Sequence, residues 1–414
     1  MKFLRDFSIN KWFLSFLILY SADGISFFNH NVYPFALIIF LLLSLYWMIR
    51  NRIRINGFIK LMIPWIFYCT ISFIYFEQIR PLFFVLIPIS FFGVYVLIKS
   101  NYDLKKIFES YEKIVFFLAK ISLLFYAWQL IDISSIISFF SLFDLNVGKS
   151  LNAIFYTIHF RSIESGIAQN CGFCWEPGPF SCFLCLALVI YLLKNKFKLD
   201  KRVLVYSITM LSTFSSTGYV CLMIIFSWFV FMNNKRYFLL SLPFALFIMY
   251  LFFIQSSVLG DKILDQMTEA EVGFEFYAEY GAEKQTSIGR FNGFLLNLKD
   301  FENYPILGHG GNFDATFSEL NNLNITSTSG LGNWLAQYGI VGFLFLLISF
   351  YRSSFLIVNI FENKGHIFLF FIFLTITFSF SLITKSIFVL FFFCFYIDRV
   401  KILKENNYKI KTQF

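Results

Sequence analysis

The amino-acid sequence predicts an all-α polytopic integral membrane protein with about 12 transmembrane helices (11–13). Three observations support this fold class. Of the 414 residues, 58% are hydrophobic, only 14% are charged, and the mean hydropathy is +0.69, which is outside the range of soluble globular domains. Apolar runs of about 20 residues, the length that crosses a bilayer as a helix, recur along the chain. Short links that contain lysine and arginine separate many of these runs.

The apolar runs place twelve spans along the chain. They lie near residues 12–29, 33–49, 58–76, 81–98, 114–131, 179–193, 203–216, 218–232, 237–255, 330–350, 366–382 and 384–397. The first run resembles a signal peptide, but because many apolar segments follow it, we expect it to remain as the first span. The two short runs around LSTFSSTGYV indicate a break between two half-length helices. A membrane tolerates such a break only where protein or water satisfies the backbone.

Two long polar links divide the chain into five parts. Residues 1–131, 179–255 and 329–414 hold the transmembrane helices, and the last part includes a basic tail. Residues 132–178 and 256–328 form two large loops. The second loop carries eleven acidic residues against four basic ones, whereas the whole chain has a net charge of +9. The basic charge is therefore concentrated around the spans.

The distribution of basic residues predicts the orientation of the protein. Of the 34 lysines and arginines, 25 fall before the first span, in alternate links or at the end of the chain. Cytoplasmic links carry such an excess of positive charge, so these segments and both termini are predicted to be cytoplasmic. The two large loops then lie on the outer side. Lys120, inside a predicted span, is expected to face the bundle interior or a cavity.

Three charged residues are the main candidates for chemistry. Glu176 precedes Pro177 and Gly178, a turn into a span whose N-terminus would attract anions. Arg161 and Arg290 lie on separate outer loops, and their guanidinium groups could together bind a lipid-linked diphosphate through paired hydrogen bonds. Two plainer interpretations stay open: Glu176 as a residue at a helix start, and the arginines as contacts of lipid headgroups.

Weaker candidates lie elsewhere on the outer side. His309, in the glycine-rich corner GHGGN, has a side chain suited to accepting a proton, although a lone loop histidine is often incidental. Arg80 and Lys284 are outer basic residues that need a local reason, and we treat them as further candidate substrate contacts. Four glutamates at helical spacing indicate a solvated outer helix, or alternatively a sugar-binding face or cation site: Glu271, Glu275, Glu279 and Glu283.

The cysteines do not favour a metal site. Cys171, Cys174, Cys182 and Cys185 have a C-x2-C-x7-C-x2-C spacing, which is shorter than that of usual zinc ribbons. The second pair falls inside an apolar span, where a charged metal centre would be costly. We therefore expect no metal, and a disulfide between Cys171 and Cys174 stays open in an oxidising outer compartment.

The order of these features resembles the O-antigen polymerase and ligase superfamily, the Wzy-like and WaaL-like membrane glycosyltransferases of the GT-C type. Arg161 and Gly172 fit the R-x10-G pattern of the first large periplasmic loop of such polymerases, and WEPG leads into the next span. STFSSTGYV resembles the serine-rich helix pair of the family. IGRFNGFLLNLKDFENYPILGHGGNF resembles the second-loop segment, an arginine followed by a Pro-x-x-Gly-x-Gly corner. The similarity covers about residues 150–345.

Departures from the family patterns favour a polymerase over a ligase. The ligase motif begins with a histidine and ends in two glycines, and Gly339 and Gly342 match its spacing, but Thr328 stands at the histidine position. A polymerase tolerates more variation there. The second loop meets the polymerase pattern only in part, because Phe301 replaces the glycine at the R-x10-G distance from Arg290.

The resemblance implies an inverting, metal-independent glycosyl transfer without cofactors at the periplasmic face of the bacterial inner membrane. A sugar hydroxyl of an undecaprenyl-diphosphate-linked repeat unit would attack the growing glycan, giving O-antigen or capsular polysaccharide. Arg161 and Arg290 would bind the diphosphate, and Glu176, with His309 as second choice, would accept the proton. The implied partners are the lipid-linked glycan, membrane lipid and a polysaccharide chain-length regulator, with no nucleic acid. A ligase acting on lipid A core, or a glycolipid flippase or transporter, are the alternatives.

Overall fold

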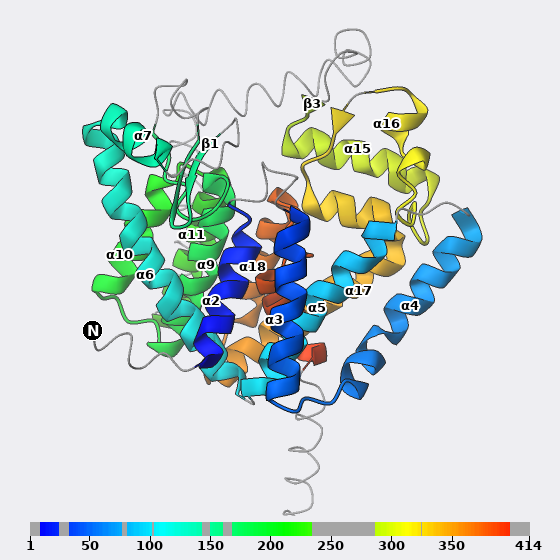
Figure 1. Ribbon diagram of the computed structural model, residues 1–414, viewed down its shortest axis with the longest axis horizontal. Helices are drawn as coiled ribbons and strands as arrows, with labels where there is room; N and C mark the ends of the chain where they lie inside the picture. Colours follow the sequence, from blue (N-terminus) through cyan, green and yellow to red (C-terminus); the bar gives the residue numbers. More distant parts are fainter. Residues whose placement is uncertain are drawn as a thin grey trace, which may run out of the picture.

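The computed structural model describes a mainly helical protein over residues 9–24, 33–76, 81–101, 103–142, 150–159, 168–233, 286–323 and 325–397 (Figure 1). In this part of the chain, five helices are long and apolar enough to cross a membrane: α4 (Asn56–Phe76), α6 (Leu104–Ile131), α9 (Pro177–Lys194), α11 (Ser216–Asn233) and α17 (Gly330–Ile360). The other main apolar helices are α2 (Ile9–Ala22), α3 (Tyr33–Arg50), α5 (Pro81–Asn101), α10 (Lys201–Ser212), α18 (His366–Ser379) and an unlabelled helix, Ser386–Ile397.

The helices agree with the expected membrane class. A helix lies at eleven of the twelve predicted spans, and the twelfth, near 237–255, falls outside the described residues. The membrane character of the chain is therefore supported, while a bundle of twelve crossing helices of the GT-C type stays a prediction. Helices predicted from apolar runs alone are found because each run is long and is bounded by polar links.

Helix α9 is the centre of the bundle. Every side chain from Gly178 to Leu193 is buried, and the helix packs against α6, α10 and α11 (Figure 1). A helix that is apolar on all sides is expected to be enclosed by other helices. Its N-terminus is thereby held in a fixed place at one end of the bundle, directly after Glu176.

The serine-rich segment is a hairpin turn and not a break between two half-length helices. Phe214 adopts a left-handed conformation (φ 47°) between α10 and α11. Asn170 donates a hydrogen bond to the Ser212 side chain at one end of the pair (3.0 Å), and Asn233 donates to the Phe197 carbonyl at the other (3.4 Å). Helix α11 has 18 residues, so only α10, with 12, is short.

The real break lies in α17, at Gly339, whose φ is +60°. The carbonyls of Ala336 and Gln337 lose their helical partners there and accept hydrogen bonds from the backbone of His309 (2.9 Å) and Gly310 (3.1 Å). Beyond the break, the amides of Ile340 and Val341 donate to the carbonyls of residues 305 (2.8 Å) and 306 (3.3 Å). The loop corner 305–310 thus satisfies the backbone on both sides of the break, as an apolar environment requires.

Glycines permit this close contact between the corner and α17. A side chain at Gly308 would place its Cβ 2.3 Å from the backbone of Gln337, and one at Gly339 would lie 2.3 Å from the Ile306 carbonyl. Tyr68 of α4 also donates to the carbonyls of Leu307 and Gln337, each at 2.8 Å. The Pro-x-x-Gly-x-Gly corner and Gly339 therefore act together, because the corner supplies hydrogen bonds to the break and the glycines allow the two backbones to approach closely.

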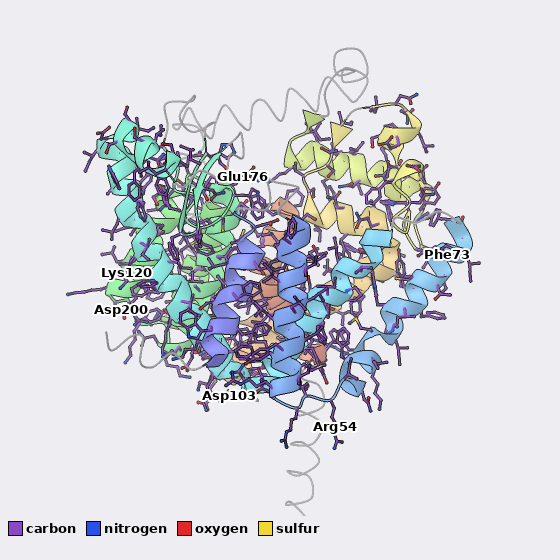
Figure 2. The ribbon with its side chains drawn as sticks, in the orientation of Figure 1. Arg54, Phe73, Asp103, Lys120, Glu176 and Asp200 are labelled. Atoms are coloured by element: carbon purple, nitrogen blue, oxygen red, sulfur yellow. The ribbon has the colours of Figure 1, made fainter. Side chains whose placement is uncertain are left out.

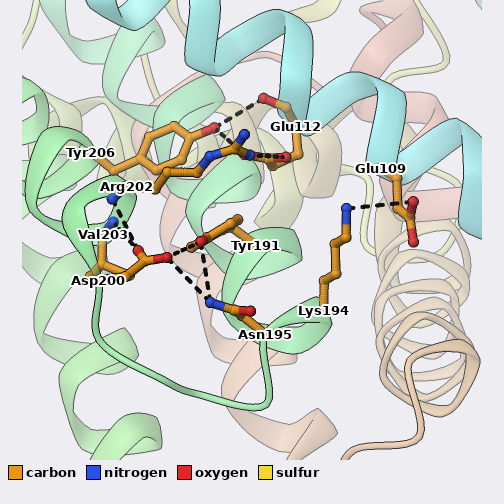
Figure 3. Close-up of polar contacts among 9 residues, drawn as sticks. All are labelled: Glu109, Glu112, Tyr191, Lys194, Asn195, Asp200, Arg202, Val203 and Tyr206. Atoms are coloured by element: carbon orange, nitrogen blue, oxygen red, sulfur yellow. Dashed lines mark hydrogen bonds and ion pairs between the residues drawn. The ribbon is translucent and has the colours of Figure 1, made fainter.

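Three of the predicted basic links meet at one end of the described bundle, which we call the basic end. Lys194 forms an ion pair with Glu109 (3.6 Å), and Lys196 donates to the Phe361 carbonyl (2.7 Å). Figure 3 shows that the buried carboxylate of Glu112 lies beside Arg202 (3.2 Å) and the Tyr206 hydroxyl (3.2 Å). These contacts join three links that are far apart in sequence, while the orientation that the charge pattern predicts stays a prediction.

The opposite end, which we call the loop end, carries the two polar loops. The first contains α7 (Ile133–Ser141) and an antiparallel pair, β1 (Ser150–Ala153) and β2 (Tyr156–His159), in which Leu151 faces Ile158. The second contains α15 (Arg290–Asn303), a 3-10 turn (Phe313–Ala315), α16 (Phe317–Leu320) and a short parallel pair, β3 (Thr286–Ser287) with β4 (Ile325–Thr326).

The charged residues within the spans behave differently from one another. Asp23, at the loop end of α2, forms an ion pair with Lys385 (2.6 Å) and is only 6% exposed. Lys120 does not face the interior as predicted. It is exposed on α6 and lies over the Phe116 ring of its own helix, 5.1 Å from the centroid (Figure 2). A lysine can take this position because its long stem lies along apolar surface.

Candidate functional site

Two of the predicted site residues, Glu176 and Arg290, lie close enough to interact electrostatically. Figure 2 shows Glu176 at the loop end. Glu176 is the residue that precedes α9, in an extended conformation, with Pro177 as the first helical residue. Proline is favoured there because a first-turn amide needs no helical partner. Arg290 is the first residue of α15, after Gly289. Two helix starts therefore position the two charged side chains.

Arg290 is held by the end of α18. Its Nε donates a hydrogen bond to the Ser379 carbonyl (2.6 Å), and its guanidinium carbon lies 4.0 Å from the centroid of the Phe380 ring. The last carbonyls of a helix lack helical partners and carry partial negative charge, so a guanidinium is a favourable partner for them. Among the described residues, Ser379 is the only hydrogen-bond acceptor of this guanidinium. Its terminal nitrogens donate to none of the described residues.

Phe380 joins the parts of this site. Its ring would meet a Cβ at Gly178 at 2.0 Å, and its carbonyl would meet one at Gly330 at 2.1 Å. The first turns of α9, α15 and α17 therefore all contact Phe380. Glu176, Arg290, Ser379 and Phe380 are called the Arg290 cluster below.

The electrostatics of the Arg290 cluster suit a bound anion. Burial lowers the pKa of Arg290, and the carboxylate of Glu176 opposes this shift. The two charges thus interact, and no direct ion pair between them is found. Helix N-termini carry partial positive charge and unpaired amides, and three of them converge on Phe380.

His309 does not lie in this cluster. It follows α15 at the end opposite to Arg290, and a helix of 14 residues is about 21 Å long. Its side chain is 3% exposed, its Nδ1 has no hydrogen-bond partner among the described residues, and its ring packs against Phe313. Burial lowers the pKa of His309 to about 4. Its observed role is structural, because its backbone amide helps to satisfy the break in α17.

The remaining predicted site residues, Arg161, Arg80 and Lys284, lie outside the described residues, as do the four spaced glutamates. Gly172, which pairs with Arg161 in the R-x10-G pattern, has a local role. Its φ is +51°, its carbonyl accepts a hydrogen bond from Thr157 (2.7 Å), and a Cβ there would lie 2.4 Å from the Phe180 ring.

The cysteines are free thiols. Cys171 and Cys174 are buried and not joined by a disulfide, and burial raises the pKa of the Cys171 thiol. Cys182 and Cys185 lie within α9. In the described part of the chain, no three histidine, cysteine, aspartate or glutamate side chains form a group that could hold a metal ion.

Sequence reasoning missed Phe380 and Ser379. Both follow an apolar run rich in phenylalanine, in which nothing distinguishes one ring from the next. The segment that follows, SLITKS, contains Lys385, the partner of Asp23. Comparisons with protein-family models, curated proteins and solved structures found no match.

Proposed function

We propose that this chain polymerises undecaprenyl-diphosphate-linked oligosaccharide repeat units by inverting glycosyl transfer without a metal or cofactor. The observation that carries the proposal is the Arg290 cluster, in which a partly free guanidinium lies close to a carboxylate at three helix N-termini. The resemblance over residues 150–345 supplies the substrate class, and the charges of the cluster suit its diphosphate and its hydroxyl.

The leaving group of the reaction is a diphosphate, on which negative charge develops as the glycosidic bond breaks. Cationic and dipolar groups that are already in place stabilise such a charge most effectively. Arg290 offers its terminal nitrogens, while Ser379 and Phe380 fix the plane of the guanidinium. The amides of the first turns of α9 and α17 would add hydrogen-bond donors. Arg161 is proposed as a second cation from the first loop.

Glu176 is the proposed proton acceptor. The attacking hydroxyl must lose a proton to a group within hydrogen-bond reach. The Glu176 side chain is partly exposed and makes no capping hydrogen bond to its own helix, so its carboxylate oxygens can face a substrate. His309 fits this role less well, because it is buried and lies at the other end of α15.

The orientation follows from the charge pattern. We propose that the basic end faces the cytoplasm and the loop end the periplasm of the bacterial inner membrane, with both termini inside. The active site would then lie at the periplasmic surface, where lipid-linked repeat units are polymerised in the family that the sequence resembles. A polysaccharide chain-length regulator is a proposed partner.

Ligation to lipid A core is the second candidate. Thr328 stands at the histidine position of the ligase motif, and its hydroxyl donates to the Ile288 carbonyl (3.1 Å) next to β3 and β4. A hydroxyl bonded to backbone cannot replace an imidazole as a base. Gly339 has a structural role in the α17 break, so its match to that motif does not favour ligation.

A flippase or transporter is disfavoured by the position of the buried charges. Charged groups in transport routes line a cavity across the membrane. Here Asp23 and Lys385 pair with each other at the loop end, and Glu112 pairs with Arg202 at the basic end. Within the described part of the chain, these two pairs are satisfied locally.

A gel of surface polysaccharide tests the proposal. The gene is deleted from the source bacterium and complemented with wild type, Glu176→Gln, Arg290→Ala or Arg161→Ala at matched expression. Lys299→Gln is the control, because Lys299 is on the same helix as Arg290 but pairs at the surface with Glu302. We expect deletion to reduce the ladder to core plus one repeat unit, restored only by wild type and the control. Long lipid-linked polymer without transfer to core would instead indicate a ligase, and an unchanged ladder would contradict both activities.

A further inference from the structure

A cavity of about 240 Å³ lies at the basic end between α2, α5 and α6. Three of its polar lining residues share one face of α6, because Lys106, Ser110 and Lys113 are spaced at i, i+4 and i+7. Lys11 of α2 and Asn101 of α5 line the other walls. Three ammonium groups and two neutral hydrogen-bonding side chains thus surround one cavity.

Two of the lysines of this cavity, Lys106 and Lys113, are only weakly neutralised by the described residues. Its single carboxylate, Glu109, forms an ion pair with Lys194 of α9. Lys113 is exposed and forms no ion pair with any described residue. Lys106 pairs with Asp103 at 3.5 Å, but 80% of its side chain is exposed, and such surface pairs contribute little. The cavity therefore retains a positive potential.

The rest of the lining is apolar. Leu14, Leu97 and Ile107 come from the ends of three helices that leave the apolar part of the bundle at this level. A soluble anion would gain nothing from these side chains. A phospholipid would place its phosphate among the lysines, with its glycerol at the edge of this apolar lining, whose side chains are at most 2% exposed.

We infer that this cavity binds the phosphate headgroup of an anionic phospholipid of the leaflet that faces the basic end. Basic pockets between helices at a cytoplasmic surface bind such headgroups. The inference depends on the proposed orientation but not on the proposed glycosyl transfer, since the cavity and the Arg290 cluster lie at opposite ends of the bundle.

Native mass spectrometry of the full-length, detergent-purified protein tests this site. Phosphatidylglycerol and phosphatidylcholine with identical acyl chains are titrated separately, and inorganic phosphate is titrated in a third series. The variant is the double substitution Lys106→Gln and Lys113→Gln. The control is the double substitution Lys198→Gln and Lys201→Gln, which removes two exposed charges at the same end outside the cavity.

The expected result is one phosphatidylglycerol bound in preference to phosphatidylcholine. The cavity variant should lose about fivefold in affinity for each lysine removed, and the control variant should bind like wild type. Equal loss in both variants would show a general surface-charge effect and overturn the site. Equal binding of the two lipids by wild type would do the same even if the cavity variant does not fold, and displacement of phosphatidylglycerol by millimolar phosphate would show a soluble-anion site instead.

Discussion

The guanidinium carbon of Arg290 lies over the ring of Phe380, 4.0 Å from its centroid, and Nε of the same side chain donates to the carbonyl of Ser379, the preceding residue (2.6 Å). These two contacts use one face and one nitrogen of the side chain. The end of α18 thus orients the side chain of the first residue of α15. The two helices are separated by more than 60 residues of sequence.

A lysine should not replace Arg290. Its ammonium keeps the charge but cannot stack on Phe380 and donate to Ser379 while offering two further nitrogens. We expect Arg290→Lys to lower the rate of polymerisation by about a hundredfold or more, similar to the loss of one preorganised donor to a developing anion. The rate is measured with purified protein and lipid-linked repeat units. A lysine variant with wild-type activity would show that charge alone is needed.

Phe380 should act as a positioning residue. Phe380→Leu keeps an apolar side chain between Gly178 and Gly330 but removes the stacking surface for Arg290. We expect kcat to fall while Phe380→Tyr, which keeps the ring, retains most of it. If leucine and tyrosine variants melt at the same temperature and have the same kcat, the stacking has no role in catalysis.

Activity should require the basic carboxylate of Glu176 and not only a side chain of its size at this position. Glu176→Gln keeps the size of the side chain but cannot accept a proton, so activity should be lost at every pH. Glu176→Asp keeps the carboxylate and should retain partial activity. Melting temperatures of both variants should match wild type, because the Glu176 side chain makes no capping hydrogen bond. Full activity of the glutamine variant would remove Glu176 from the mechanism.

Asp23 and Lys385 should matter to stability mainly because each compensates the charge of the other in a buried place. Their mutual attraction should contribute less. Removing one partner of a buried pair leaves an uncompensated charge, at a cost of about 3 to 5 kcal/mol. Asp23→Asn or Lys385→Met alone should therefore lower the melting temperature more than the two substitutions together. Additive losses in this double-mutant cycle would show that the two residues do not interact in the folded protein.

Opposite pH dependences are expected for two buried groups of the second loop. Burial lowers the pKa of His309 to about 4, so its stabilising contribution is complete above pH 6.5 and is lost as pH falls towards 4. Burial raises the pKa of Asp300 to about 6, although its carboxylate accepts a hydrogen bond from the Phe317 amide (2.5 Å). Its destabilising contribution is absent below pH 3.8 and grows as pH rises towards 6.

Single substitutions should separate these two contributions. Asp300→Asn leaves the histidine, so stability should rise with pH between 4 and 6, whereas His309→Phe leaves the aspartate, so stability should fall over the same range. Each change amounts to roughly 3 kcal/mol at most. Melting temperatures across this range measure both slopes, and parallel slopes for the two variants would contradict the assignment.

Much of the helical fold could be predicted from the sequence, because each span is a long apolar run between polar links. The span near 179–193, for example, corresponds to α9 within two residues at its start and one at its end. The break at Gly339 could not be predicted in the same way. It depends on hydrogen bonds to residues 305–310, which are close only in the folded protein. Lys120 was misplaced because hydropathy gives depth in a span but not the direction of a side chain.

The candidate site was predicted in part. Glu176 and Arg290 could be chosen from their charges and neighbours, and the structure brings them together at two helix starts. Phe380 has no distinguishing feature in the sequence, because its role arises from the meeting of three helices. His309 was chosen for its chemistry, but burial in the loop corner decides its environment.

Polymerisation by the purified protein tests the central claim most directly. The full chain in detergent is mixed with undecaprenyl-diphosphate-linked repeat units, and the products are separated by size. Wild type and Lys299→Gln should give a ladder of two, three and more repeat units with release of undecaprenyl diphosphate, while Glu176→Gln and Arg290→Ala give none. A ladder of equal yield from all four proteins, or transfer by wild type only to lipid A core, would contradict the proposed polymerase.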